Sequence, residues 1–210
     1  MNCRLCSFNN NSVQIKGKDK RNYFLCNNCK LINVYPEFFL DESQEKIRYR
    51  EHQNGFHHEG YLKFLNRAVQ PALKFLNEGM TGLDYGCGYA PTISKILSQN
   101  GLNCENYDPI FFNKELNKKY DFIFSTEVFE HFFYPLKEIE TLTNIIKTNG
   151  LLIVMTERWN NEQDFNNWYY TTDPTHVAFY HNTTFDYICN KYAFDKLYDD
   201  GNRVIILRKL

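Results

Sequence analysis

A glycine-rich turn between a short apolar strand and a helix constrains the fold of this chain more than any other stretch. The turn and its flanks read Leu83-Asp84-Tyr85-Gly86-Cys87-Gly88-Tyr89-Ala90-Pro91. Gly86 and Gly88 carry no Cβ, so the backbone can turn tightly there and approach a ligand closely. Pro91 suits the first turn of a helix, and the free N–H groups at a helix start favour an electron-rich ligand. The stretch therefore predicts an α/β unit that binds a nucleotide-like ligand.

An acidic residue follows at the distance that such a unit requires. Asp108 lies twenty residues after Gly88 and ends the expected second strand, residues 104–108. In nucleotide-binding α/β units this position supplies the carboxylate that binds the ribose hydroxyls. The dinucleotide pattern Gly-x-Gly-x-x-Gly is not met, because Pro91 replaces the third glycine. The pattern is instead Asp-x-Gly-x-Gly, with Asp84 leading.

This pattern resembles motif I of the class I (Rossmann-like) S-adenosyl-L-methionine (SAM)-dependent methyltransferases, and Asp108 matches the acidic residue of their second strand. A second motif agrees with it. The buried strand expected at residues 120–125 leads into Thr126-Glu127-Val128-Phe129-Glu130-His131, which is similar to the Glu-Val-x-Glu-His that follows the fourth strand in that family. The resemblance covers about residues 37–210 and implies SAM as the cofactor. The cofactor-binding residues that it implies are Asp84, Gly86, Cys87, Gly88, Asp108, Thr126 and Glu127.

The same resemblance implies an α/β fold with a Rossmann-like, seven-stranded, mostly parallel sheet whose last strand is antiparallel. Periodicity predicts helices over residues 60–77, 92–99 and 184–192, and one from Pro135 that closes at Asn149-Gly150. Pro71 is expected to kink or split the first helix. A hairpin is predicted from residues 194–198 and 204–207 across an Asp-Gly turn. Only about a dozen residues separate Asp108 from Tyr120, so we expect a short or irregular third strand.

Two cysteine pairs at the start of the chain have the spacing of a four-thiolate zinc site. They are Cys3-x-x-Cys6 and Cys26-x-x-Cys29, with nineteen residues between them. Four ligands leave no open position for catalysis, so we expect a structural Zn²⁺ that supplies folding energy to a zinc ribbon of residues 1–36. Two unrelated cysteine pairs or a disulfide are the alternatives.

The ribbon is basic, which leaves two interpretations of its surface open. It contains one acidic residue, Asp19, and six basic residues: Arg4, Lys16, Lys18, Lys20, Arg21 and Lys30. Contact with nucleic acid is one interpretation. However, Zn²⁺ bound by four thiolates has a net charge of −2, which lowers the net charge of the ribbon to about +3. The basic residues are also not accompanied by aromatic residues in a pattern that would stack on bases. A solvated hairpin face is therefore favoured.

Residues 37–79 join the ribbon to the methyltransferase domain, which we expect at residues 80–210. This segment holds a run dense in hydrogen-bonding side chains, residues 48–54, and three histidines in or near that run: His52, His57 and His58. An exposed helical connector and an N-terminal lid over the cofactor or substrate are equally consistent with this composition.

Methyl transfer from a sulfonium is an in-line displacement, in which an enzyme aligns the reactants and removes a proton from the acceptor. His176 is the first candidate base, because it follows the expected fifth strand and has Asp173 close by in the sequence. Related quinol O-methyltransferases have a Thr-His in a comparable place. His131 and Glu127, which follow the fourth strand, are the other candidates. A packed His176 beside a helix-capping Asp173 is the structural alternative.

The resemblance and these residues predict an enzyme that transfers a methyl group from SAM to a small molecule. Oxygen is the favoured acceptor atom, with nitrogen and carbon as the other choices. An RNA methyltransferase is the second hypothesis, because certain ribosomal-RNA guanine methyltransferases also carry an N-terminal zinc ribbon. A non-catalytic SAM-binding module is the third, and the complete Asp-x-Gly-x-Gly pattern disfavours it.

Composition restricts the partners and the compartment. The net charge of −1 provides no field that would draw the whole chain to nucleic acid or to anionic lipid. No apolar run approaches the ~20 residues of a membrane span, and the start of the chain lacks the apolar region of a signal peptide. We therefore expect a cytoplasmic protein whose partner is a small-molecule substrate. No sequence feature indicates an oligomeric state.

Overall fold

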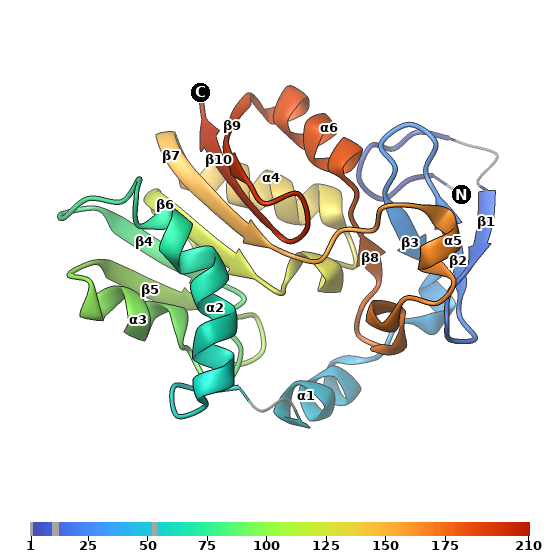
Figure 1. The fold of residues 1–210 in the computed structure, drawn as a ribbon, viewed down its shortest axis with the longest axis horizontal. Helices are drawn as coiled ribbons and strands as arrows, with labels where there is room; N and C mark the ends of the chain where they lie inside the picture. Colours follow the sequence, from blue (N-terminus) through green and yellow to red (C-terminus); the bar gives the residue numbers. More distant parts are fainter. Residues whose placement is uncertain (1, 10–12, 52–53) are drawn as a thin grey trace.

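The computed structural model describes residues 2–9, 13–51 and 54–210. Within these residues a six-stranded sheet forms the centre, in the order β5-β4-β6-β7-β10-β9 (Figure 1). Its strands are β4 (Thr81–Tyr85), β5 (Asn103–Tyr107), β6 (Tyr120–Thr126), β7 (Ile146–Met155), β9 (Phe194–Asp199) and β10 (Val204–Lys209). Strands β5, β4, β6 and β7 are parallel, whereas β10 runs antiparallel to both β7 and β9. The mostly parallel α/β sheet with an antiparallel last strand is confirmed.

Helices cover both faces of this sheet, because successive strand residues point to opposite sides. The helices are α1 (Glu42–Glu51), α2 (Glu59–Ala72), α3 (Ile93–Gln99), α4 (Pro135–Ile145), α5 (Glu162–Phe165) and α6 (Asn182–Tyr192). α4 and α6 share one apolar core with Ile123 and Leu152, whereas α2 and α3 share the other with Phe122 and Ile153. Figure 1 shows the sheet between these two helix pairs. No helix among the described residues is long and apolar enough to cross a membrane.

The prediction of seven strands is wrong by one strand within the described residues. The third strand of the expected order would lie between β5 and β6 in sequence and at the sheet edge beside β5. The chain instead makes an isolated bridge between Asp108 and Phe112 and reaches β6 without a helix or strand. About a dozen residues are too few for the crossover helix and strand that a further parallel strand requires. The sheet therefore ends at β5.

Two helix ends also differ from the prediction. α2 continues through Pro71 and ends at Ala72 instead of residue 77, and the chain then turns, with the N–H of Phe75 donating to the carbonyl of Ala72 at 2.9 Å. α4 ends at Ile145 and β7 begins at the next residue, so Asn149 and Gly150 lie within a strand. The helix at α3, the helix at α6 and the hairpin of β9 and β10 are confirmed.

The N-terminal lobe forms a second sheet that includes a strand from the far end of the chain. Its strands are β1 (Val13–Lys16), β2 (Asn22–Leu25), β3 (Ile32–Val34) and β8 (Ala178–Phe179), in that order. β8 pairs antiparallel with β3, so that Ile32 lies opposite Phe179. Tyr23, Val177 and Phe179 belong to one apolar core between this lobe and the C-terminal third. The lobe is therefore packed directly against the segment that precedes α6 (Figure 1).

Candidate functional site

A cavity of about 860 Å³ opens where β4, β5 and β6 end. The segments that follow these three strands form one side of it, at residues 86–89, 108–110, 126–128 and 130–134. Side chains of α1, of α2, of residues 169–176 and of Arg203 contribute to the rest of the wall. The carboxyl ends of parallel strands are where open α/β sheets bind their ligands, so this cavity is the candidate site.

The glycine turn lies on the cavity wall in the backbone conformation that its sequence predicts. Gly86 has a φ of 83°, and a Cβ added there would lie 2.5 Å from a methyl carbon of Val128. Gly88 has a φ of 63°, and a Cβ added there would meet no atom within 4 Å. The two glycines thus have different tasks. Gly86 lets two turns pack closely, and Gly88 leaves open space at the cavity wall.

Asp108 is fixed beside this turn by backbone donors. Its Oδ2 accepts the N–H of Gly88 at 3.0 Å, and its Oδ1 accepts the N–H groups of Ile110 and Phe111 at 2.9 and 3.0 Å. A carboxylate held in this way at the end of the second strand is oriented to accept hydroxyl donors from a ribose. The turn and Asp108 therefore fit the cofactor that the sequence predicts.

The other predicted cofactor residues divide into two groups. Cys87, Thr126 and Glu127 line the cavity, and burial raises the pKa of the Cys87 thiol, so it stays protonated. Asp84 lies beneath the turn with 2% of its surface exposed, and it does not reach the cavity wall. Burial and the neighbouring Asp108 raise the pKa of the Asp84 carboxyl to about 8. Asp84 is thus a buried residue behind the turn and not part of the cavity lining.

Glu127 forms a charged pair that the sequence analysis missed. Its backbone is left-handed, with a φ of 54°, and its Oε2 accepts Nη1 of Arg203 at 2.7 Å. The Arg203 guanidinium also contacts the carboxylate of Glu157 and the hydroxyl of Tyr169. Burial and the nearby Glu130 raise the pKa of Glu127, against the effect of Arg203. Arg203 immediately precedes β10, the last strand of a hairpin, where no local pattern indicates a site.

The structure brings His131 and His176 together on the cavity wall, with ring centroids 4.9 Å apart. Nδ1 of His176 lies 2.8 Å from the carbonyl oxygen of Tyr170, and Nδ1 of His131 lies 3.1 Å from that of Thr175. A carbonyl only accepts, so each Nδ1 carries the proton and each Nε2 keeps its lone pair. Burial, reinforced by His131, lowers the pKa of His176 to about 3, and burial also lowers that of His131. Both rings are neutral at pH 7.

Glu130, which was not predicted as a site residue, completes this cluster. One ligand-type atom from each of Glu130, His131 and His176 lies within 4.8 Å of the others. Both carboxylate oxygens of Glu130 are already hydrogen-bonded, one to the hydroxyl of Thr156 at 2.8 Å and one to that of Tyr170. Glu130 is therefore held in place beside the two imidazoles by Thr156 and Tyr170.

α1 closes one side of the cavity through few contacts. Nη2 of Arg48 donates to Oδ2 of Asp173 at 2.7 Å, and the ring of Tyr49 stands edge-on to His131 at 5.3 Å. No side chain of α1 is buried. Of the connector histidines, His57 and His58 do not line the cavity, and His52 lies outside the described residues.

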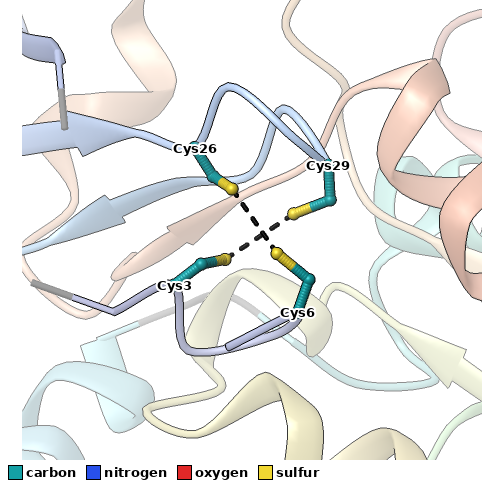
Figure 2. A group of neighbouring side chains, drawn as sticks. All are labelled: Cys3, Cys6, Cys26 and Cys29. Carbon is teal, nitrogen blue, oxygen red and sulfur yellow. Dashed lines mark hydrogen bonds between the residues drawn. The ribbon is translucent and has the colours of Figure 1, made fainter. Parts of the chain in front are cut away.

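The four N-terminal cysteines form a second cluster, whose sulfur atoms point to a common centre (Figure 2). Sγ of Cys3 lies 3.6 Å from that of Cys29, and Sγ of Cys6 lies 3.5 Å from that of Cys26. Disulfide sulfurs lie about 2.05 Å apart, so these pairs are not disulfides, and all four cysteines are free. A tetrahedron with Zn–S distances of about 2.3 Å has edges of about 3.8 Å. The donor set and its spacing therefore fit Zn²⁺.

Comparisons with known proteins agree with this geometry. Residues 49–198 match the sequence profile of the methyltransferase domain family, whereas a comparison with curated protein sequences finds no match. Magnesium protoporphyrin IX methyltransferase from Synechocystis PCC 6803, solved with bound SAH, is similar in structure, with a TM-score of 0.59 and 16% identity over 80% of this chain and 95% of that one. A SAM-dependent methyltransferase from Archaeoglobus fulgidus gives 0.54 and 13%, over 70% and 94%.

An O-methyltransferase family protein from Burkholderia thailandensis is also similar, with a TM-score of 0.53 and 14% identity over 71% of this chain. The match spans only 57% of the Burkholderia protein. At these identities the neighbours establish a shared fold.

Proposed function

Since this chain belongs to the methyltransferase domain family and is a SAM-dependent methyltransferase, we propose that it methylates a small, hydroxyl-bearing molecule in the cavity at the ends of β4, β5 and β6. One observation carries the proposal. The glycine turn with Asp108 and the histidine pair line the same cavity. The cavity can therefore hold a cofactor and an acceptor together.

Bound SAM supplies an electrophilic methyl group on a sulfonium. The residues of this chain then have two tasks, to align the acceptor and to take its proton. His176 suits the second task, because donation of Nδ1–H to Tyr170 turns the unprotonated Nε2 away from that carbonyl. Asp173 raises the pKa of His176 against burial, so it stabilises the imidazolium as it forms. His131 and Glu127, on the same wall, are the alternative proton acceptors.

The size and lining of the cavity support a small acceptor. Pockets of ~300–1,000 Å³ are typical of small-molecule sites, and this one measures about 860 Å³. Aromatic side chains that include Tyr49, Phe133 and Tyr170 line it. A neutral imidazole beside such surfaces favours oxygen of a phenol, quinol or sugar as the acceptor atom.

The basic residues of the N-terminal lobe give little support to an RNA substrate. Arg4 and Arg21 both donate to backbone carbonyls of this chain, so their charge is not offered to phosphates. Exposed Lys16, Lys18 and Lys20 remain. A test uses calorimetry with S-adenosylhomocysteine (SAH) and transfer of labelled methyl groups from SAM to a panel of phenols, sugars and quinols. Transfer to RNA alone, or binding of NADH without SAH, would contradict the proposal.

Replacing Asp108 with alanine is expected to weaken SAH binding by about tenfold or more, because a lost charge-assisted pair costs roughly 1.5–3 kcal/mol. Asp108→Asn keeps one acceptor oxygen, enough for the N–H groups of Ile110 and Phe111, but it loses the charge and the oxygen that accepts from Gly88. We expect it to weaken binding less than Asp108→Ala does. Calorimetry measures both. Asp186→Ala, which removes an exposed carboxylate on α6, is the control. Equal affinities for Asp108→Ala and this control would remove Asp108 from the site.

Zn²⁺ at the four cysteines is the second part of the proposal. Purified protein is expected to contain about one zinc ion per chain, as in four-thiolate structural sites. Cys26→Ser should lose the metal and destabilise the N-terminal lobe, while SAH still binds, because the glycine turn belongs to the other lobe. Metal analysis checks the content, with Cys189→Ser as the control thiol. Protein that holds no zinc after purification without chelators would refute this part.

A further inference from the structure

Arg21 immediately precedes β2 in the N-terminal lobe, and all of its N–H donors are engaged within the protein. The side chain is only 9% exposed, and its Nε donates to the carboxylate of Asp19. The other four N–H groups go to backbone carbonyls of a single segment, at 2.6–3.0 Å. These carbonyls belong to Thr171, Asp173, Pro174 and His176.

That segment begins in a short 3₁₀ helix (Tyr169–Thr172), continues without regular structure to β8 and lies against the cavity. Of the four carbonyls, that of Asp173 also accepts the N–H of His176, at 3.2 Å. Carbonyls that lack ladder partners need donors from elsewhere, and a guanidinium provides several in one plane. The segment includes Asp173 and His176, both on the cavity wall. The guanidinium of Arg21 is therefore a principal tie of the segment to the N-terminal lobe, beside the hydrogen bonds that Thr175 donates to the Asp173 carboxylate within it.

The far end of the segment is tied to the same lobe. The N–H of Val34 and Nη2 of Arg4 both donate to the carbonyl of Val177, at 2.9 and 3.0 Å. The next two residues pair with β3, which follows the Cys26-x-x-Cys29 turn. The N-terminal lobe thus holds the segment from Thr171 to Phe179 at both ends.

We propose that Arg21 is a positioning residue of the active site, whose guanidinium fixes residues 171–176 so that His176 faces the cavity. The four-cysteine lobe then helps to shape the part of the active site that binds the acceptor. The inference depends on the proposed function in one point, that His176 acts on the methyl acceptor. Arginine is needed because the ammonium of lysine, a single nitrogen, cannot span carbonyls on four residues.

The test compares Arg21→Met, which keeps the length of the side chain and removes every donor, with Lys20→Met, an exposed neighbour. Arg21→Lys keeps the charge with one donor nitrogen. Four readouts are taken on each full-length variant: amide exchange of residues 171–178, the imidazole ¹⁵N signals of His176 (assigned with His176→Gln), SAH affinity and zinc content. Turnover is added with any acceptor that the panel identifies.

For Arg21→Met we expect amide exchange in residues 171–178 to rise about tenfold or more. The His176 ring should lose the signature of a fixed Nδ1–H tautomer, and turnover should fall by about tenfold or more. SAH affinity should stay within about twofold of the wild type, with zinc retained. Arg21→Lys should show the same changes to a smaller degree. This pattern separates positioning from a general loss of structure, which would also weaken SAH binding.

Exchange rates and imidazole signals in Arg21→Met that match those of Lys20→Met would overturn the proposal. If Arg21→Met fails to fold, Arg21→Lys decides, and wild-type exchange and imidazole signals in that variant reject the role. These two readouts need no acceptor. Suppose that Arg21→Met changes the exchange rates and the imidazole signals, but the wild type methylates no small molecule. That result would contradict the proposed function, whereas the role of Arg21 in fixing residues 171–176 would still hold.

Discussion

Replacing His176 with alanine is expected to slow methyl transfer by about 10²–10⁴-fold, the usual contribution of a positioned base, while SAH binds with unchanged affinity. The reason is geometric. His176 stands on the wall formed by residues 169–176, whereas the glycine turn and Asp108 form the cofactor wall. Turnover at saturating SAM and acceptor measures the loss of rate, and calorimetry with SAH on the same protein measures the affinity.

His57→Ala is the matched control, because His57 is exposed and does not line the cavity. It should keep both turnover and affinity. Full turnover in His176→Ala at saturating acceptor would show that His176 is a packed residue whose Nδ1 only binds Tyr170. The role of base would then pass to His131 or Glu127, which line the same cavity.

The pH profile of the wild type gives an independent measure of the same ring. An unperturbed imidazole would produce an inflection near pH 6.5, but burial and His131 lower the pKa of His176 to about 3. The ring is then already neutral, so the rate should not rise through pH 6.5 on its account. The unfolded chain does bind a proton below about 6.5, so the folded state loses stability as the pH falls below that value. Unfolding is therefore monitored alongside the rate.

The positions of Gly86, Gly88 and Asp108 at the edge of the sheet could be predicted because their determinants are local. Gly86, Gly88 and Asp108 belong to consecutive strand-to-helix and strand-to-turn units, and their conformation follows from residue type and spacing. The gap of about a dozen residues between Asp108 and Tyr120 predicted a short or irregular third strand, but the described residues there form no strand, so the seven-stranded sheet was wrong. Local signals also misplaced a helix end: α4 ends at Ile145, although Asn149 does have the left-handed backbone of a turn, with a φ of 61°.

The part of the site around His176 depends on contacts between distant parts of the chain, which a pattern does not reveal. β8 has two residues, too few for an alternation, and its partner β3 lies near the other end of the chain. Arg21 looked like one of six basic residues on a solvated hairpin, yet it is buried against residues 171–176. Arg203 is likewise recognisable as a site residue only from its partners in space. Glu130 belongs to the motif after the fourth strand, but its hydrogen bond with Tyr170 could not be read from that motif.

Replacing Gly88 with leucine is expected to reduce SAH affinity by about a hundredfold or more, which corresponds to roughly 2.7 kcal/mol. The position of a Cβ on Gly88 is free of other atoms within 4 Å and lies at the cavity wall. A leucine side chain would therefore extend into space that we assign to the cofactor. Its left-handed backbone, with a φ of 63°, adds a cost of ~1–2 kcal/mol to folding. Calorimetry measures the affinity, and thermal unfolding measures the cost.

Gly101→Leu separates these two effects, because Gly101 has a similar φ of 74° and equally open surroundings, but lies on the exposed turn after α3. Both variants should lose similar stability, since the backbone cost is the same. Only Gly88→Leu should lose SAH, because only Gly88 borders the cavity. If both variants bind SAH as the wild type does, the cofactor does not pass Gly88. If both lose it equally, strain in the fold and not the occupied space explains the result.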